Sequence, residues 1–393
     1  MITQDLIRRI FSAANISRWN DHVRPFDFAE LDKQAHKMII AYVLAKFEED
    51  SGNKIDWQKL IEGGIFELFQ RIMLTDLKPE VFHEIMSKKS AELNKWVIKN
   101  LHSDIAPVKG GFEKRLEEYF FKKNYAPLEK RILAAAHVMS TKWEFGIIYP
   151  LNLKVYGIAR TKKEIDASAL KFNDLAGMKK LASNKKFYAF LGMCAQLRFQ
   201  QRWAQAFRVP KTTVLGHMLI VAIFSYISSL ELGACNKRLY NNFFSGLFHD
   251  LPEILTRDIV RPVKNSISGL EDIIRLYETK QVHEKILPLI PKKWHPEMKY
   301  FIEDEFSNKI MPRGKALVVE SIGAKNNTAA QNPTDGKLIE ICDKFSAYIE
   351  ASLALESGIK SPSLLASKKA LYKAFAFKTY EGIKFKRVFD YFA

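Results

Sequence analysis

Two histidines and two aspartates stand inside otherwise apolar helical patterns in the second half of the chain: His217, His249, Asp250 and Asp343. Burying ionisable side chains costs free energy unless something compensates them, and a bound cation is one such compensation. Imidazole and carboxylate ligands together suit Mn²⁺, Co²⁺, Zn²⁺, Fe²⁺ or Ni²⁺. Four protein ligands leave an octahedral ion with open positions for water and a phosphate oxygen. The pattern therefore predicts a site for one divalent transition-metal ion.

A further carboxylate follows the His249–Asp250 pair in the stretch HDLPEILTRD. Glu253 is four residues beyond His249, so on a helix it would share the face of that histidine, and we expect a general acid or base there. Pro252 lacks the N–H that the carbonyl four residues earlier would accept, so the helix is expected to kink or restart beside the pair. An ion pair or a helix-terminal cap is the alternative interpretation of the pair.

The elements that must position these side chains are helices. Nearly every long segment carries apolar residues at i, i+3, i+4 and i+7, and no alternating strand pair or Asn-Gly hairpin is found. The segment from Val214 to Leu230 is the most hydrophobic, and we expect a buried core helix rather than a membrane span, since it includes His217 and several hydroxyl residues. The predicted fold class is all-α.

Four landmarks recur in the same order in the two halves of the chain. Each is weak alone, but their common order favours a tandem duplication. The spacing of 39 residues between the histidine and the threonine is identical in both halves. The paired landmarks are Arg18-Trp19 with Arg202-Trp203, His36 with His217, Thr75 with Thr256, and residues 136–144 with residues 342–350.

Laying the halves together places apolar residues in the first half opposite the predicted ligands. Leu68 stands opposite His249 and Phe69 opposite Asp250, while His137 stands opposite Asp343. The first half is therefore expected to keep the scaffold and to lack the metal. The predicted organisation is a degenerate metal-less helical domain over 1–160, a basic linker over 161–185 and a catalytic domain over 186–393, with the two domains packed as a pseudo-dimer within one chain.

The composition favours anionic binding partners but does not identify which anion is bound. The formal net charge is +17, which attracts anions in general: nucleotides, nucleic acid or acidic lipid. Three separate cysteines in apolar segments, Cys194, Cys235 and Cys342, fit a reducing compartment, and no signal peptide is evident at the N-terminus. We therefore expect a cytoplasmic protein that does not associate with membranes.

The order H…HD…D, with HDLPEILTRD at its centre and Arg-Trp fifteen residues before the first histidine, resembles the HD-domain metal-dependent phosphohydrolases. It is most similar to the bacterial 5'-deoxynucleotidases, which remove phosphate from deoxynucleoside monophosphates using a divalent ion. The resemblance covers roughly residues 187–357. It implies an all-helical fold. Because single-copy relatives tend to associate, it also favours, together with the internal repeat, two tandem HD-type domains packed as a pseudo-dimer.

The resemblance also implies roles for individual residues. It makes His217, His249, Asp250 and Asp343 the metal ligands. Glu253 and Asp258 match the catalytic carboxylates of the family, and Arg202 and Trp203 match its phosphate- and sugar-contacting pair. Arg202 offers a planar fork to phosphate and Trp203 a flat face to sugar or base. Lys264 is a further candidate for phosphate, although a solvated lysine is the commoner interpretation.

Departures from the family pattern leave the substrate open. The segment before His217 lacks the Ser-Glu pair frequent in the family, the stretch from Ser266 to Gly336 is long, and residues 323–336 are expected to form a polar loop before the helix of Asp343. The expected function is removal of phosphate from a (deoxy)nucleoside 5'-monophosphate. The alternatives are a phosphodiesterase acting on cyclic or oligonucleotide substrates, and a non-catalytic regulator that binds nucleotide or nucleic acid; no helix-turn-helix, zinc finger or aromatic-basic RNA motif supports nucleic acid.

Overall fold

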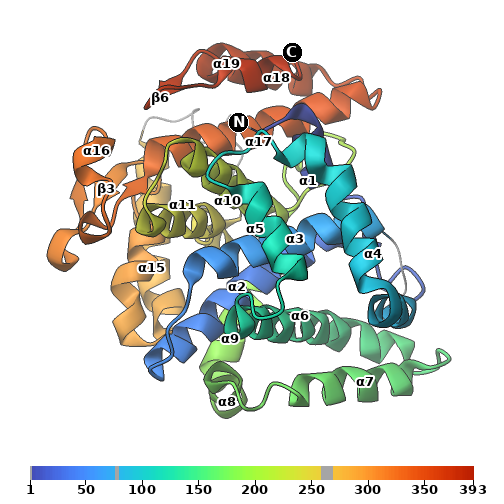
Figure 1. Ribbon diagram of the computed structural model, residues 1–393. Coiled ribbons are helices and arrows are strands. Elements are labelled where there is room, and N and C mark those ends of the chain that lie inside the picture. Colours follow the sequence, from blue (N-terminus) through green and yellow to red (C-terminus); the bar gives the residue numbers. More distant parts are fainter. Residues whose placement is uncertain (1, 76–78, 258–268) are drawn as a thin grey trace. The chain divides into compact units, whose positions relative to one another are not determined.

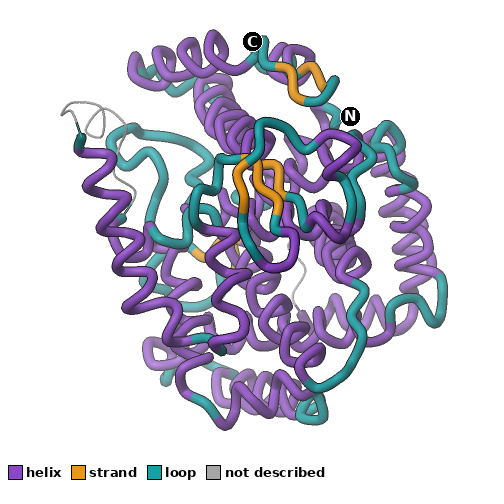
Figure 2. Tube along the Cα trace, turned by 90° about the vertical axis from the view of Figure 1, so that its left-hand side faces the viewer, coloured by secondary structure: helices purple, strands orange, loops and turns teal. Residues whose placement is uncertain are grey.

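The computed structural model describes residues 2–75, 79–257 and 269–393. Figure 2 shows that the described chain is mostly helical, and its short strands form two antiparallel pairs and one three-stranded sheet. The prediction of an all-α fold is confirmed. The chain divides into two compact units, residues 2–188 and 189–393, and α9 (Lys185–Gln196) begins in the first and ends in the second.

The N-terminal unit is built on the packing of a long buried helix, α2, against α6. Its two strands form one antiparallel pair, in which Arg18 lies opposite Phe28. Residues 161–185, predicted to be a linker, fall largely within two helices, of which α8 packs against α2. The elements are α1 Gln4–Ser12, β1 Ser17–Arg18, β2 Phe28–Ala29, α2 Glu30–Asp50, α3 Trp57–Leu74, α4 Pro79–Ile105, α5 Phe112–Phe121, α6 Pro127–Ile148, α7 Ile158–Leu170 and α8 Ala176–Ser183.

The C-terminal unit is centred on α10, which packs against both α11 and α17 (Figure 1). A three-stranded antiparallel sheet, in the order β4-β3-β5, precedes α17. The elements are α10 Val214–Glu231, α11 Asn236–Phe248, α12 Glu253–Thr256, α14 Leu270–Gln281, α15 His295–Ile302, β3 Asn308–Ile310, β4 Leu317–Val318, α16 Gly323–Asn326, β5 Thr334–Asp335, α17 Gly336–Glu356, α18 Pro362–Phe375, β6 Thr379–Tyr380, β7 Ile383–Lys384 and α19 Lys386–Asp390.

Helix α10 begins at a side-chain cap and is buried along most of its length. The Thr213 hydroxyl accepts a hydrogen bond from the Gly216 N–H at 3.1 Å, which satisfies one of the first N–H groups of the helix. By length and composition α10 could cross a membrane, but 89% of its apolar window is buried inside the protein. It is a core helix, and His217 in its first turn is fully buried.

A buried ion pair anchors the start of α17 to α11. The Arg238 guanidinium donates to both carboxylate oxygens of Asp335, at 2.6 and 2.7 Å, and the Tyr380 hydroxyl donates to the same carboxylate at 2.5 Å. Fork-to-carboxylate bonding of this kind restricts both position and rotation. The network therefore sets where Asp343, two turns into α17, lies relative to α11.

Close approach of α11 to α10 depends on Gly246. A Cβ built on Gly246 would lie 2.9 Å from the Ala222 Cα and 3.0 Å from its N, both backbone atoms of α10. We predict that Gly246→Ala destabilises the protein by about 1–3 kcal/mol, because a rigid backbone must move to admit the methyl group. Urea denaturation measures the effect.

Gly146 provides the matched control for this substitution. It lies near the end of α6, is exposed, and has no neighbour within 4 Å of a built Cβ. Gly146→Ala should leave stability unchanged or raise it by up to about 1 kcal/mol. Equal effects of the two substitutions would contradict the role assigned to the α10–α11 contact.

Candidate metal centre

Three side chains from three helices converge in the C-terminal unit. The ligand atoms of His217, His249 and Asp343 lie within 4.8 Å of one another, and all three residues are buried. His217 comes from the first turn of α10, His249 caps the C-terminus of α11, and Asp343 lies on the inner face of α17. Among the described residues this is the one such group of histidine, cysteine and carboxylate side chains.

Asp250 completes the set predicted from the sequence. Its Oδ2 atom lies 3.1 Å from His249 Nε2 and 3.8 Å from His217 Nε2. Its side chain is 19% exposed, whereas those of the two histidines are essentially inaccessible. Solvent therefore reaches the group on the Asp250 side.

Hydrogen bonds behind the imidazole rings aim the Nε2 atoms at the common centre. His249 Nδ1 lies 2.9 Å from the carbonyl of Gly246. Because a carbonyl only accepts, Nδ1 carries the proton, and Nε2, which lies 3.1 Å from Asp250 Oδ2, is the ring nitrogen that faces the common centre. A ring held by its Nδ1 in this way can offer Nε2 to a cation that also binds the neighbouring carboxylate.

His217 is held in a more adaptable way. Its Nε2 lies 3.0 Å from Asp343 Oδ1, and its Nδ1 lies 3.1 Å from the Ser346 hydroxyl. A hydroxyl donates and accepts equally well, so Ser346 can support either neutral tautomer of the ring. The ring can therefore present its Nε2 lone pair without losing its partner on the other side.

The two aspartates are held ionised. Burial alone would raise the pKa of Asp250, but His249 outweighs it and holds that pKa well below its usual range. Burial likewise opposes ionisation of Asp343, and there the Lys344 ammonium, in direct contact with the carboxylate, keeps the pKa far below the ordinary value. Two anionic carboxylates beside two imidazoles form a donor set suited to a divalent cation.

Arg202 and Trp203, the predicted substrate contacts, lie at the edge of this group. Arg202 Nη1 is 3.8 Å from Asp250 Oδ2. Arg202 Nε, at 3.2 Å, and Trp203 Nε1, at 2.7 Å, both donate to Oε2 of Glu350, a fully buried residue of α17. One carboxylate therefore positions both side chains. Burial alone would raise the pKa of Glu350, but the Arg202 guanidinium lowers it to about 2.

Of the two predicted catalytic carboxylates, only Glu253 is among the residues that the structure describes. Helix α11 ends at Phe248 and α12 restarts at Glu253, immediately after Pro252, so the predicted interruption beside the pair is confirmed. The continuous helical face assumed for His249 and Glu253 is consequently wrong. Glu253 is instead positioned through its backbone, whose carbonyl accepts a hydrogen bond from the Gln200 side chain at 3.1 Å. Asp258 and Lys264 lie outside the described residues.

Four residues near the group were missed by sequence reasoning. Ser346 and Glu350 follow Asp343 at i+3 and i+7, a spacing that could have identified them, and Lys344 is adjacent to Asp343. Glu305 lies in the loop before β3, where burial raises its pKa and His249 and Asp250 also act on it electrostatically. No local pattern marks Glu305, because its proximity depends on how the loop folds back.

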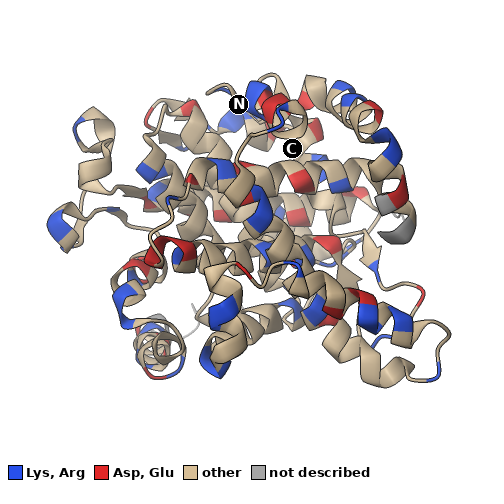
Figure 3. Ribbon diagram, turned by 60° about the horizontal axis from the view of Figure 1, so that its bottom comes forward, with Lys and Arg blue, Asp and Glu red and all other residues tan. Residues whose placement is uncertain are grey.

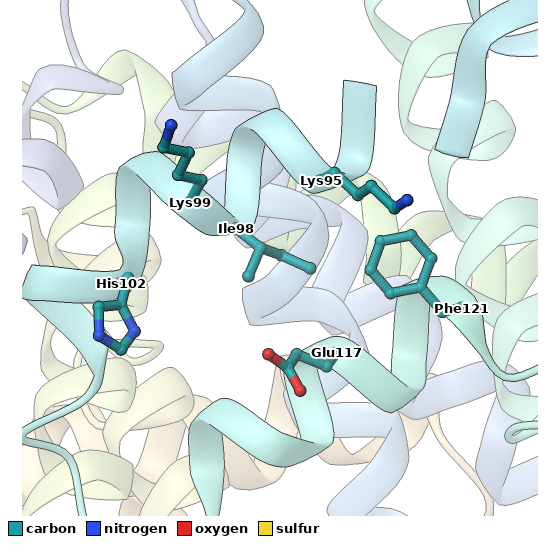
Figure 4. Close-up of a pocket in the computed structure, with 6 residues that line it drawn as sticks. All are labelled: Lys95, Ile98, Lys99, His102, Glu117 and Phe121. Atoms are coloured by element: carbon teal, nitrogen blue, oxygen red, sulfur yellow. The ribbon is translucent and has the colours of Figure 1, made fainter. Parts of the chain in front are cut away.

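A pocket of about 350 Å³ lies in the N-terminal unit (Figure 4). It is lined by residues of α4 and α5, which include Lys95, Lys99, His102 and Glu117. His102 Nδ1 lies 2.6 Å from Glu113 Oε1, within hydrogen-bond distance. The pocket holds none of the predicted site residues.

Residues 194–370 match a family model described as HD domain. This segment contains the four converging residues together with Arg202, Trp203 and Glu350. It lies wholly within the C-terminal unit, residues 189–393. HD domains bind divalent metal ions and are in general metal-dependent hydrolases. No curated protein matches the sequence.

Proposed function

We propose that this HD-domain protein is a metal-dependent phosphohydrolase that removes phosphate from a nucleotide, with a (deoxy)nucleoside 5'-monophosphate as the substrate. The observation that carries the proposal is the convergence of two imidazoles and two carboxylates beside an arginine held in place by a buried carboxylate. The proposed ligands are His217, His249, Asp250 and Asp343, for one Mn²⁺, Co²⁺, Zn²⁺, Fe²⁺ or Ni²⁺ ion. When bound, the ion supplies Lewis-acid chemistry that activates water and neutralises phosphoryl oxygens.

Arg202 is proposed to bind the phosphate. Its Nε is engaged by Glu350, and this contact turns the Nη1 end toward Asp250, the exposed member of the group. A guanidinium in this orientation can donate to phosphoryl oxygens while the substrate is near the metal. Trp203, whose indole N–H is taken by Glu350 and which packs against the small cluster of Ala351, Ala354 and Leu364, is proposed to offer a ring face to the sugar or base.

Glu253 is proposed to move the proton that the reaction requires. It stands three residues after Asp250, at the start of α12, and Gln200, two residues before Arg202, holds its carbonyl. Its carboxyl can protonate the leaving 5'-oxygen or orient the attacking water. Asp258 is proposed to assist it, and Lys264 to contact phosphate.

The N-terminal unit is proposed to be a degenerate copy of the same domain and its pseudo-dimer partner. Arg18 Nε and Trp19 Nε1 both lie 2.9 Å from Glu144 Oε2, the arrangement that Arg202 and Trp203 make with Glu350. Both tryptophans have positive φ, 56° and 58°, which is uncommon for a side chain of this size. These shared contacts support duplication of one scaffold.

Phosphate release from a panel of nucleotides, with each candidate metal ion added in turn, tests the proposal. Nucleoside 5'-monophosphates should be hydrolysed, and comparing the rates for the ribose and deoxyribose forms gives the sugar preference. Hydrolysis confined to cyclic or oligonucleotide substrates would replace the proposal by a phosphodiesterase. Absence of phosphate release with every ion and substrate would favour the alternative of a non-catalytic regulator that binds nucleotide or nucleic acid.

Nucleic-acid binding is the weaker alternative. The net charge of +17 favours it, but Figure 3 shows Lys and Arg spread over many elements with Asp and Glu among them. A steep fall of DNA affinity with rising salt would support this alternative, because binding would then depend on released counterions.

Ser346 supports the ring of His217, so its removal should weaken metal binding. We predict that Ser346→Ala lowers metal affinity by about 10–100-fold, the usual range for a lost hydrogen bond behind a ligating histidine. Metal titration against a competing chelator measures the change. Ser140→Ala, at the hydroxyl 3.4 Å from His36 Nδ1 in the N-terminal unit, is the matched control and should leave metal affinity unchanged.

A further inference from the structure

A second arginine, Arg208, is buried in the loop between Trp203 and α10. It lies six residues after Arg202 and is 1% exposed. Its Nη2 contacts the Thr212 hydroxyl, whereas its Nε and Nη1 are buried without a hydrogen-bond partner among the described residues. Buried donors that stay unpaired cost stability, so hydrogen bonds of its own do not account for this arginine. What Arg208 contributes therefore depends on the group that it reaches through Thr212.

The Thr212 hydroxyl connects Arg208 to Glu350. Thr212 Oγ1 donates to Glu350 Oε1 at 2.6 Å, and Thr212 is 1% exposed. Since a hydroxyl has one proton, the same oxygen accepts from the Arg208 guanidinium, which can only donate. Burial lowers the pKa of Arg208 while the Glu350 carboxylate opposes this shift, and a guanidinium stays protonated in proteins at neutral pH. A chain of hydrogen bonds therefore runs from a cation, Arg208, to an anion, Glu350.

Glu350 is shared between two arginines. Its Oε2 accepts from Arg202 Nε at 3.2 Å and from Trp203 Nε1 at 2.7 Å, while its Oε1 accepts from Thr212. Burial would raise the pKa of Glu350, but Arg202, followed by Arg208, lowers it to about 2. The Thr212 carbonyl also accepts the Arg202 N–H at 3.0 Å. Thr212 therefore fixes both the backbone of Arg202 and the carboxylate that orients its side chain.

The N-terminal unit lacks this connection. Arg18 lies opposite Phe28 in the β1–β2 pair, and Arg202 lies opposite Thr212 through its backbone hydrogen bond. Phe28 therefore occupies the place of Thr212 and offers no hydroxyl. A chain of hydrogen bonds through a side-chain hydroxyl at this position is a property of the C-terminal unit.

The two units also distribute charge differently around these arginines. In the N-terminal unit two fully buried carboxylates, Glu30 at 2.8 Å and Glu144 at 2.9 Å, hold the counterpart of Arg202. In the C-terminal unit a single carboxylate, Glu350, serves two guanidinium groups. A further carboxylate, that of Asp250, lies 3.8 Å from Arg202 and is a proposed metal ligand. Arg202 therefore keeps positive charge that the phosphoryl group of a substrate can compensate.

We propose that Arg208 and Thr212 are positioning residues that act through Glu350 to set the affinity of Arg202 for a phosphoryl group. The inference rests on the proposed function, because it concerns the same nucleotide site. Thr212 fixes the direction of the carboxylate that orients Arg202, and Arg208 takes up part of its negative charge. None of the proposed metal ligands belongs to this chain of hydrogen bonds, so its loss should weaken nucleotide binding without releasing the metal.

Calorimetric titration of the metal-loaded full chain with nucleoside 5'-methylenephosphonates, which have no scissile P–O ester bond, tests the inference. Thr212→Val keeps the shape of the side chain and removes the hydroxyl, so the Kd should rise about tenfold. The KM for the nucleotide should rise by a similar factor with kcat little changed, because Arg202 contacts phosphate both before and during the reaction. Thr212→Ser keeps the hydroxyl, and its Kd should stay within about threefold of the wild-type value.

Further variants and the metal content separate positioning from folding. Arg208→Met should also raise the Kd, and Thr212→Val carries the test if that buried substitution impairs folding. Ser352→Ala is the control, because this buried hydroxyl of α17 donates within its own helix, to the Tyr348 carbonyl at 2.8 Å. It should leave Kd and KM unchanged. The metal content of every variant should equal that of the wild type.

Failure of the inference and failure of the proposed function give different results. If the wild type binds none of the phosphonates and releases no phosphate, the proposed function fails and this inference fails with it. If the wild type binds them and Thr212→Val does not weaken binding, or Thr212→Ser weakens it as much, the inference alone is overturned. Loss of metal from Thr212→Val would likewise overturn it.

Discussion

Replacing His249 by alanine should abolish metal binding and lower kcat/KM for phosphate release by at least about 10³-fold, since a bound cation contributes several kcal/mol to phosphoryl transfer. His249 Nε2 is buried and lies 3.1 Å from Asp250 Oδ2, within the group of side chains proposed to hold the ion. Elemental analysis of the purified variant, together with phosphate release, measures both effects.

His36→Ala is the matched control for this substitution. His36 is a buried histidine that lies 3.4 Å from Ser140, as His217 lies beside Ser346, but no metal-ligand group surrounds it among the described residues. Its replacement should lower stability and leave metal content and kcat/KM unchanged. Retention of a full equivalent of metal by His249→Ala would contradict the assignment of this histidine as a ligand.

Glu350→Gln should destabilise the C-terminal unit by about 3–5 kcal/mol, because it breaks a buried ion pair and leaves the Arg202 guanidinium only the more distant Asp250 carboxylate at 3.8 Å. The same change should lower phosphate release, since Glu350 positions both Arg202 and Trp203. Chemical denaturation and KM for the nucleotide measure the two effects.

Glu144→Gln makes the same change in the N-terminal unit. Glu144 is fully buried and holds Arg18 and Trp19 as Glu350 holds Arg202 and Trp203. We expect a similar loss of stability with little change in KM. A rise of KM in both variants would show that the nucleotide site depends on both pairs and would contradict a catalytic role confined to the C-terminal unit.

Lowering the pH should remove the contribution of the ionised Glu350 carboxylate to the free energy of unfolding. Its pKa is lowered from 4.5 to about 2 in the folded protein. A carboxylate with a lowered pKa stabilises the fold fully above its unfolded pKa, and this stabilisation is lost as the pH falls from about 4.5 through about 2. The difference in unfolding free energy between wild type and Glu350→Gln should therefore shrink over that range and stay constant above pH 5.5 or so. A constant difference throughout would contradict the ion pair.

Local sequence determined the helices and the chemical character of the site. Apolar periodicity predicts α10, α11 and α17, because a helix buries one stripe of its residues whatever it packs against. Pro252 predicts the break between α11 and α12, because a missing N–H acts on its own turn. Polar side chains within apolar stripes likewise identified His217, His249, Asp250 and Asp343 as a group that needs compensation.

Tertiary structure alone decided which side chains meet. The contact of Arg202 with Glu350 joins residues 148 positions apart, and that of His217 with Asp343 joins residues 126 apart. Such contacts depend on how α17 is anchored to α11 by Arg238 and Asp335, which no helical period encodes. The same holds for Glu305 and for the hydrogen bond from Thr212 to Glu350. Helical periodicity arises from neighbours within one or two turns, whereas a site built from several helices is determined by packing across the whole unit.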